Sequence, residues 1–95
     1  MLNLYNQKPV SIFMHEGCGS YIVKFCNVQM QLKMCQFKSF NNYLTNLSKK
    51  ISSSTTQVEL LLVKKNLTVT ISINNFLQLM HGVRSVAQKN YNLKN

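Results

Sequence analysis

A strand–turn–strand–helix pattern occurs twice in the chain, thirty-nine residues apart, and this repetition limits the fold more than any other feature. In each copy an asparagine precedes three apolar residues that alternate with polar ones, and a helical stripe follows. The matching positions are Asn27 and Asn66, Val28 and Leu67, Met30 and Val69, Leu32 and Ile71, Phe37 and Phe76, and Phe40 and Leu79. A period of two indicates half-buried strands, and a spacing of three and four indicates an amphipathic helix. The sequence therefore predicts two tandem ββα units.

The predicted fold class is α+β, with an antiparallel sheet of four to five strands and two helices packed on one face of it. A strand that is apolar on one side only is typical of an antiparallel sheet covered on one side. Strands are expected at 10–15, 21–25, 28–34, 58–63 and 67–72, and helical stripes at 37–51 and 76–87. We expect residues 1–95 to form one domain, in which 1–8 and 89–95 are loose tails.

Two residues of the second helix allow local predictions. Ser72 precedes the apolar stripe, and its hydroxyl can accept a hydrogen bond from the backbone of Asn74 or Asn75 as an N-cap. Gly82 lies inside the stripe, where a glycine costs about 1 kcal/mol relative to alanine. Its presence indicates close packing at that point, and the first helix is the expected neighbour.

The bulk composition predicts a protein without a membrane span. No apolar run approaches the roughly 20 residues that a spanning helix needs, and the first residues do not have the pattern of a secretory signal. We therefore expect a cytoplasmic protein. Its three cysteines are an odd number, which favours reduced thiols over a disulfide framework.

The net charge of +9 is the largest deviation in composition, and it has two interpretations. An anionic partner, such as nucleic acid, would explain it. An AT-rich coding sequence, with many lysines and asparagines, would also explain it. The lysines are scattered, and four that are expected in loops are the candidate anion contacts: Lys49, Lys50, Lys64 and Lys65.

The residue types that carry catalysis or bind metals are sparse, and no motif joins them. His15, Cys18, Cys26 and Cys35 are suitable zinc donors, but they lack the paired C-x2-C spacing of structural zinc sites. Cys26 and Cys35 fall at opposite ends of one predicted strand, which places them too far apart for one ion. The sequence has no Gly-rich phosphate loop. We expect no enzyme, no metal and no cofactor, and a Cys18–His15 enzyme is only a third alternative.

An apolar patch on the solvent side of the predicted sheet is the most unusual feature. Ile22, Leu61 and Val63 fall on the strand faces that the alternation assigns to solvent. Exposed apolar patches commonly mark interaction sites. These three residues are therefore the candidate interface for a protein partner or a homodimer.

The segments HEGCGSYIVKFCNVQMQLKMCQFKSFNNYL and VELLLVKKNLTVTISINNFLQLMHGV, which fall within residues 15–87, resemble a family of small bacterial cytoplasmic proteins of unknown function. The shared pattern is a Gly/Cys turn, a strand, an F-x-N connection, an alternating strand and a helix that opens with Phe. The chain departs from the usual form because no acidic residue precedes Phe37 or Phe76. The resemblance implies the architecture and brings no activity.

These observations favour a small non-enzymatic protein that acts by binding a protein partner or by forming a homodimer. The alternative is a basic protein or regulator that associates with nucleic acid.

Overall fold

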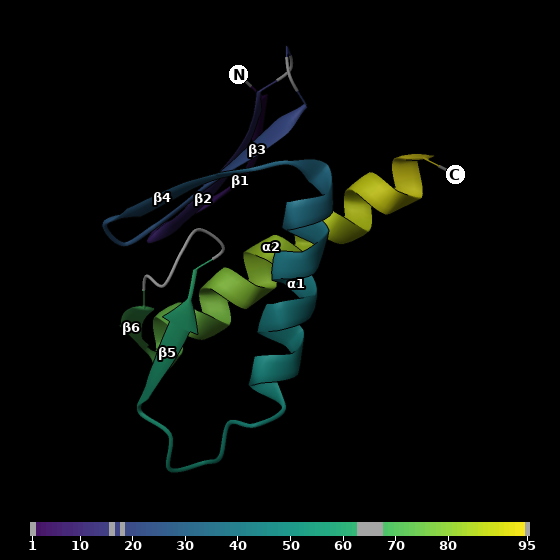
Figure 1. Cartoon of the computed structure of the whole chain (residues 1–95). Helices are drawn as coiled ribbons and strands as arrows, with labels where there is room; N and C mark the ends of the chain where they lie inside the picture. Colours follow the sequence, from purple (N-terminus) through teal and green to yellow (C-terminus); the bar gives the residue numbers. More distant parts are fainter. Residues whose placement is uncertain (1, 16, 18, 63–67, 95) are drawn as a thin grey trace.

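The computed structural model describes residues 2–15, 17, 19–62 and 68–94, with side chains as far as Lys89. The fold is α+β and consists of a four-stranded antiparallel sheet, a two-stranded antiparallel sheet and two helices (Figure 1). The strands are β1 (Leu2–Gln7), β2 (Val10–His15), β3 (Ser20–Phe25), β4 (Val28–Leu32), β5 (Gln57–Leu61) and β6 (Thr68–Ser72). The helices are α1 (Met34–Ser48) and α2 (Ile73–Lys94).

The larger sheet has the strand order β1-β2-β3-β4, so each strand pairs with its neighbour in sequence. The register places Ile12 opposite Val23, and Val23 opposite Met30. Because opposed residues of an antiparallel pair share a face, these positions belong to one apolar face of the sheet. Tyr21, Val23 and Phe25 share this face in the register, as predicted, and all three are buried.

The hydrophobic core lies between that apolar face, the two helices and the β5–β6 hairpin. The Tyr21 ring stacks on the Phe37 ring with 4.3 Å between centroids, which fixes the start of α1 against β3. Phe40, Leu44 and Phe76 are almost completely buried. Full burial of such a side chain contributes roughly 1.5–3 kcal/mol, so these residues dominate the packing of the helices.

The helices are placed differently from the prediction. α2 runs beneath the sheet and contacts β1 and β2, whereas α1 touches β3 and β4 with its first turns and then extends away from the sheet (Figure 1). The two helices contact each other, and Arg84 of α2 donates a hydrogen bond to Oγ1 of Thr45 in α1 at 3.4 Å. The predicted packing of both helices side by side on one sheet face is not confirmed.

The tandem repeat also stays a prediction. Helices α1 and α2 begin thirty-nine residues apart, at Met34 and Ile73, and the matching pair Phe37 and Phe76 is buried. However, β3–β4 belongs to the larger sheet and β5–β6 forms a sheet of its own. The larger sheet reaches four strands because β1 pairs with β2, and not by joining the two hairpins.

Residues 2–7 correct a further expectation, because they form an edge strand and not a loose tail. Its side chains explain why: the Tyr5 ring lies against Gly82 of α2, where an added Cβ would be 2.7 Å from Tyr5 Cε2. Gly82 therefore packs closely, as predicted, but against β1 and not against α1. At the other end of the chain, α2 continues to Lys94.

Hydrogen bonds at the ends of the elements agree with parts of the local predictions. The Asn75 backbone N–H donates to Oγ of Ser72 at 3.2 Å, so the predicted N-cap of α2 is confirmed. Lys33 precedes α1, and its backbone N–H donates to the Gln36 side chain at 2.9 Å. In the β3–β4 turn, Cys26 has a positive φ of 54°. The Asn75 side chain reaches back to this turn and lies 3.5 Å from Cys26 Sγ.

Candidate functional site

The face of the larger sheet opposite the core carries a set of polar side chains with one aromatic ring, and no described element lies over it (Figure 1). We call this surface the open face. The pairing register assigns to it the side chains of Asn3, Asn6, Ser11, Phe13, Ile22, Lys24, Gln29 and Gln31. Among these described residues there is no carboxylate. The open face therefore offers amide donors and acceptors together with positive charge.

Phe13 is the aromatic residue of the open face. It lies on β2 opposite Ile22 of β3, and its ring is partly exposed. The Lys24 ammonium lies 5.6 Å from the ring centroid, within the range of a cation–π contact. Ile22 is only 8% exposed, because it sits between Phe13 and Gln31 in the register. The centre of the face therefore presents the partly exposed Phe13 ring, bordered by amides and one ammonium.

A polar depression adjoins the same face at the far end of β4. It has a volume of about 330 Å³ and is lined by Ser20, Gln31, Lys33 and Gln36. Lys24 pairs with Gln29 at the other end of the strand. Lys33 comes four positions after Gln29, so it lies about 13 Å along the strand from the Lys24–Gln29 pair at about 3.3 Å per residue. The glutamines of β4 therefore have a lysine at each end of their row.

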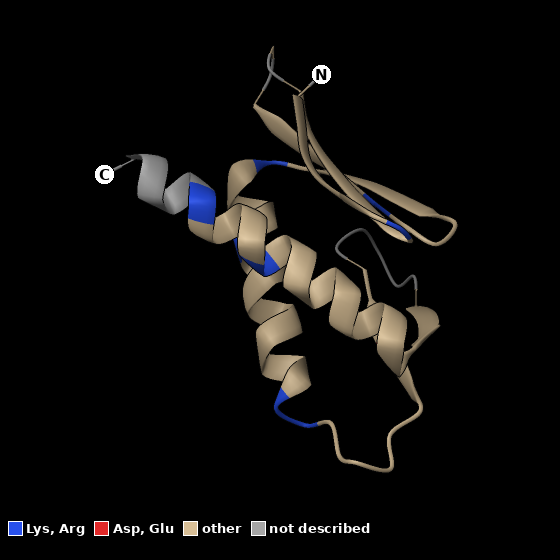
Figure 2. Cartoon of the chain, turned by 180° about the vertical axis from the view of Figure 1, so that it is seen from behind, with Lys and Arg blue, Asp and Glu red and all other residues tan. Residues whose placement is uncertain are grey.

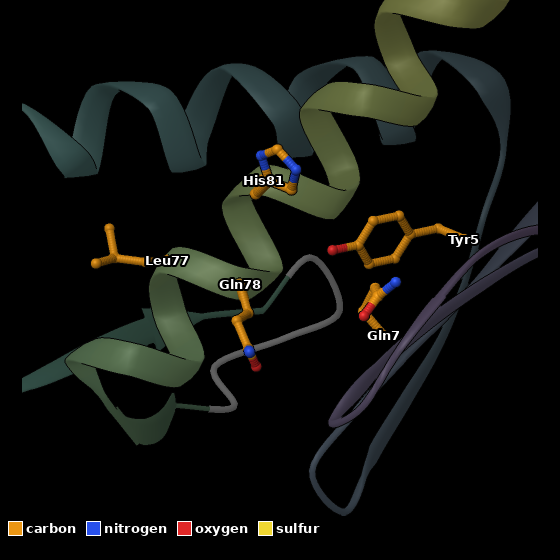
Figure 3. A pocket seen from close by; sticks show the side chains of 5 residues that line it. All are labelled: Tyr5, Gln7, Leu77, Gln78 and His81. Carbon is orange, nitrogen blue, oxygen red and sulfur yellow. The ribbon is translucent and has the colours of Figure 1, made fainter.

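A second hollow lies between the edge strand β1 and helix α2, with a volume of about 430 Å³. Its lining residues are Tyr5, Gln7, Leu77, Gln78 and His81. Figure 3 shows Tyr5 and Gln7 reaching from β1 toward α2, with Leu77 at the end farthest from Tyr5. The Tyr5 and His81 rings meet edge to face, 6.3 Å between centroids. We call this hollow the β1–α2 groove. His81 is exposed on the surface of α2.

The predicted interface patch is not assembled. Ile22 is buried within the larger sheet, and so it cannot contribute exposed apolar area. Leu61 is 57% exposed, as predicted, but it belongs to the separate β5–β6 sheet. Its backbone N–H donates to the Tyr43 hydroxyl at 2.9 Å, which ties the end of β5 to α1. Val63 lies outside the described residues.

The predicted anion contacts do not gather either. Lys49 and Lys50 are exposed just after α1, at the end of that helix farthest from the larger sheet (Figure 1). Lys64 and Lys65 lie outside the described residues. Figure 2 shows Lys and Arg positions in the larger sheet, at both ends of α1 and in the second half of α2. The described lysines therefore make no single cluster, and Lys24 and Lys33 are the two associated with the open face.

The candidate catalytic and metal-binding residues do not form a site within the described part of the chain. Cys26 and Cys35 are exposed free thiols, and Cys18 lies outside the described residues. Within the described part of the chain, no group of three or more His, Cys, Asp or Glu side chains could hold a metal ion. The described helices include none with the length and apolar character needed to cross a membrane.

The most informative site residue, Phe13, was missed by sequence reasoning. The segment Ile12–Phe13–Met14 is an apolar run, and so its alternation does not reveal which side chain faces solvent. Pairing with β3 decides the matter, because Phe13 stands opposite Ile22 and between two inward residues. The only local signal was Ser11, a polar residue two positions earlier on the same face.

No known family model, curated protein or solved structure matches this chain, so the resemblance to small bacterial proteins of unknown function stays an expectation.

Proposed function

We propose that the protein binds single-stranded nucleic acid on the open face of its four-stranded sheet and acts by binding, without catalysis. The observation that carries this proposal is the partly exposed Phe13 ring beside Lys24, on a sheet face that is rich in amides. Proteins that bind single strands combine aromatic side chains, on which bases stack, with cationic groups that follow the phosphates. The open face supplies both kinds of group.

The chemistry of the surrounding side chains supports the same partner. Each carboxamide of Asn3, Gln29 and Gln31 has donors and an acceptor, which match the hydrogen-bonding edges of unpaired bases. A double helix hides those edges and presents a convex surface. A sheet face with one partly exposed ring therefore suits an unpaired strand better than a duplex.

The charge distribution supports a polyanion over a neutral partner. The chain carries +9, and the described residues of the open face include no acid. Lys24 and Lys33 would each neutralise one phosphate. Two such contacts on a single strand give a slope of about −1.4 in log affinity against log salt, which is about a seven-fold loss between 50 and 200 mM salt.

The test is fluorescence anisotropy with a labelled twelve-nucleotide oligouridine and with the corresponding oligothymidine, at 50 and 200 mM salt. Replacing Phe13 with Leu removes the ring but retains an apolar side chain, whereas Phe13→Tyr retains the ring. Loss of one stacked base costs about 1–3 kcal/mol, which is roughly a five-fold to more than a hundred-fold weaker Kd. Phe13→Tyr should bind like the parent protein.

Lysine variants test the electrostatic part. Lys24→Gln should weaken binding and reduce the salt slope by about 0.7. Lys89→Gln is the matched control, because Lys89 is an exposed lysine on α2, away from the open face. Equal effects of the two substitutions would indicate a response to net charge alone and would rule out a site on the open face. Absence of binding at 50 mM salt would end the proposal altogether.

A further inference from the structure

The free edge of β1 carries no lysine and no proline, two residue types that commonly prevent edge strands from pairing, and its protective feature is the bulge between Asn3 and Tyr5. An edge strand directs backbone N–H and C=O groups outward, and natural sheets commonly protect such an edge with lysine or proline. From Leu2 to Gln7 there is no charged residue and no proline. Lys8 and Pro9 come only at the turn. Within the described residues, β1 pairs with β2 alone, so its other edge can accept another strand.

The side chains of β1 are compatible with their own copies. A twofold axis places the same surface patch on both subunits, so each patch must be complementary to itself. Asn3, Asn6 and Gln7 carry amides that both donate and accept, and an amide can therefore bond to another amide. A lysine or a carboxylate at these positions would repel its copy. The uncharged strand is thus suited to pairing with a second molecule of this chain.

The bulge in β1 selects a register for that pairing. The register with β2 shifts between Asn3 and Tyr5, so Asn3 and Asn6 both lie on the open face. Opposed residues in an antiparallel pair must share a face. Asn3 of one copy can therefore stand opposite Asn6 of the other, and Leu2 opposite Gln7. This register engages the whole length of both strands.

The β1–α2 groove gives the apolar part of the contact. Leu2 is 47% exposed and Leu77 is 44% exposed, and of the two only Leu77 lines the groove of its own chain. Gln7 and Leu77 line the same groove. When Leu2 of the second copy stands opposite Gln7, its side chain lies at this groove and can pack toward Leu77. The pairing thereby buries Leu2 and Leu77 at each of the two symmetry-related contacts.

From these observations we propose that two copies of the chain associate through antiparallel β1–β1 pairing, which places Leu2 of each copy in the β1–α2 groove of the other. The result is a continuous eight-stranded sheet whose two open faces join into one surface. The other edge strand, β4, is also uncharged, but the groove and the exposed leucines accompany β1.

The experiment is sedimentation velocity of the full chain, without nucleic acid, over a range of protein and salt concentrations. We expect a species of twice 11.0 kDa whose population increases with salt, because two chains of net charge +9 repel each other less when they are screened. Nucleic-acid binding should weaken with salt, so the two proposals give opposite salt responses and can fail separately.

Asn6→Lys replaces the amide that faces Asn3 of the second copy with a cation, and the two introduced cations lie about 10 Å apart along the paired strands. The substitution removes the amide–amide contact and adds repulsion between the copies, so it should shift the species to monomer. Gln29→Lys is the matched control, because it also replaces an amide of the open face with a lysine, but on the other edge strand, β4. It should leave the dimer intact. A monomer under all conditions would overturn the proposal. Loss of the dimer in Gln29→Lys but not in Asn6→Lys would also overturn it, because pairing would then use β4. Amide hydrogen exchange that slows in β1, and not in β4, as protein concentration rises would be the independent confirmation.

Discussion

Replacing Gly82 with alanine tests the contact that holds β1 against α2. An alanine Cβ at this position would be 2.7 Å from Cε2 and 2.9 Å from Cδ2 of Tyr5, so the ring would have to move. Overpacking of this kind costs about 1–3 kcal/mol, whereas alanine gains about 1 kcal/mol of helix propensity over glycine. The net effect in the parent protein is therefore between no change and a destabilisation of about 2 kcal/mol.

The same substitution should have the opposite sign when the ring is absent. In a Tyr5→Ala background the steric cost disappears, so Gly82→Ala should stabilise the protein by about 1 kcal/mol. The difference between the backgrounds is a coupling energy of about 1–3 kcal/mol, which a double-mutant cycle measures directly. Urea unfolding followed by circular dichroism gives the four free energies. Equal stabilisation in both backgrounds would refute the packing of Tyr5 on Gly82, and with it the placement of β1.

Three further predictions concern other parts of the fold. Leu44→Ala removes a fully buried side chain of α1 and should cost about 2–5 kcal/mol in unfolding free energy; a loss below 1 kcal/mol in urea titration would place Leu44 outside the core. Tyr43→Phe removes the acceptor of the Leu61 backbone N–H and should cost about 0.5 kcal/mol, with faster exchange of that amide; an unchanged exchange rate would contradict the contact. Cys26 and Cys35 are exposed, so iodoacetamide should modify both under native conditions, and mass spectrometry showing either one protected would contradict its placement.

Strand faces were predictable where polar and apolar residues alternate strictly. In β4, Gln29 and Gln31 face out and Leu32 is buried, because a period of two leaves one arrangement only. Ser72 was predictable for a similar reason, since a hydroxyl before an apolar stripe has few other roles. These features depend on neighbours in sequence.

Features that depend on distant residues were not predictable. Half of the residues from Leu2 to Gln7 are amides, which are not strand formers, so the local propensity does not favour a strand. It is ordered by pairing with β2 and by the contact of Tyr5 with Gly82, seventy-seven residues away in sequence. The outward position of Phe13 likewise depends on the register with β3. The division of the strands into two sheets follows from long-range pairing, which local patterns leave open.

The central claim is that the open face holds an unpaired nucleic-acid strand, and amide chemical-shift mapping tests it most directly. On addition of oligouridine at 50 mM salt, we predict shifts concentrated at Phe13, Lys24 and Gln31, with α2 around Arg84 unchanged. Shifts concentrated on α2, or spread over all lysines equally, would contradict the account.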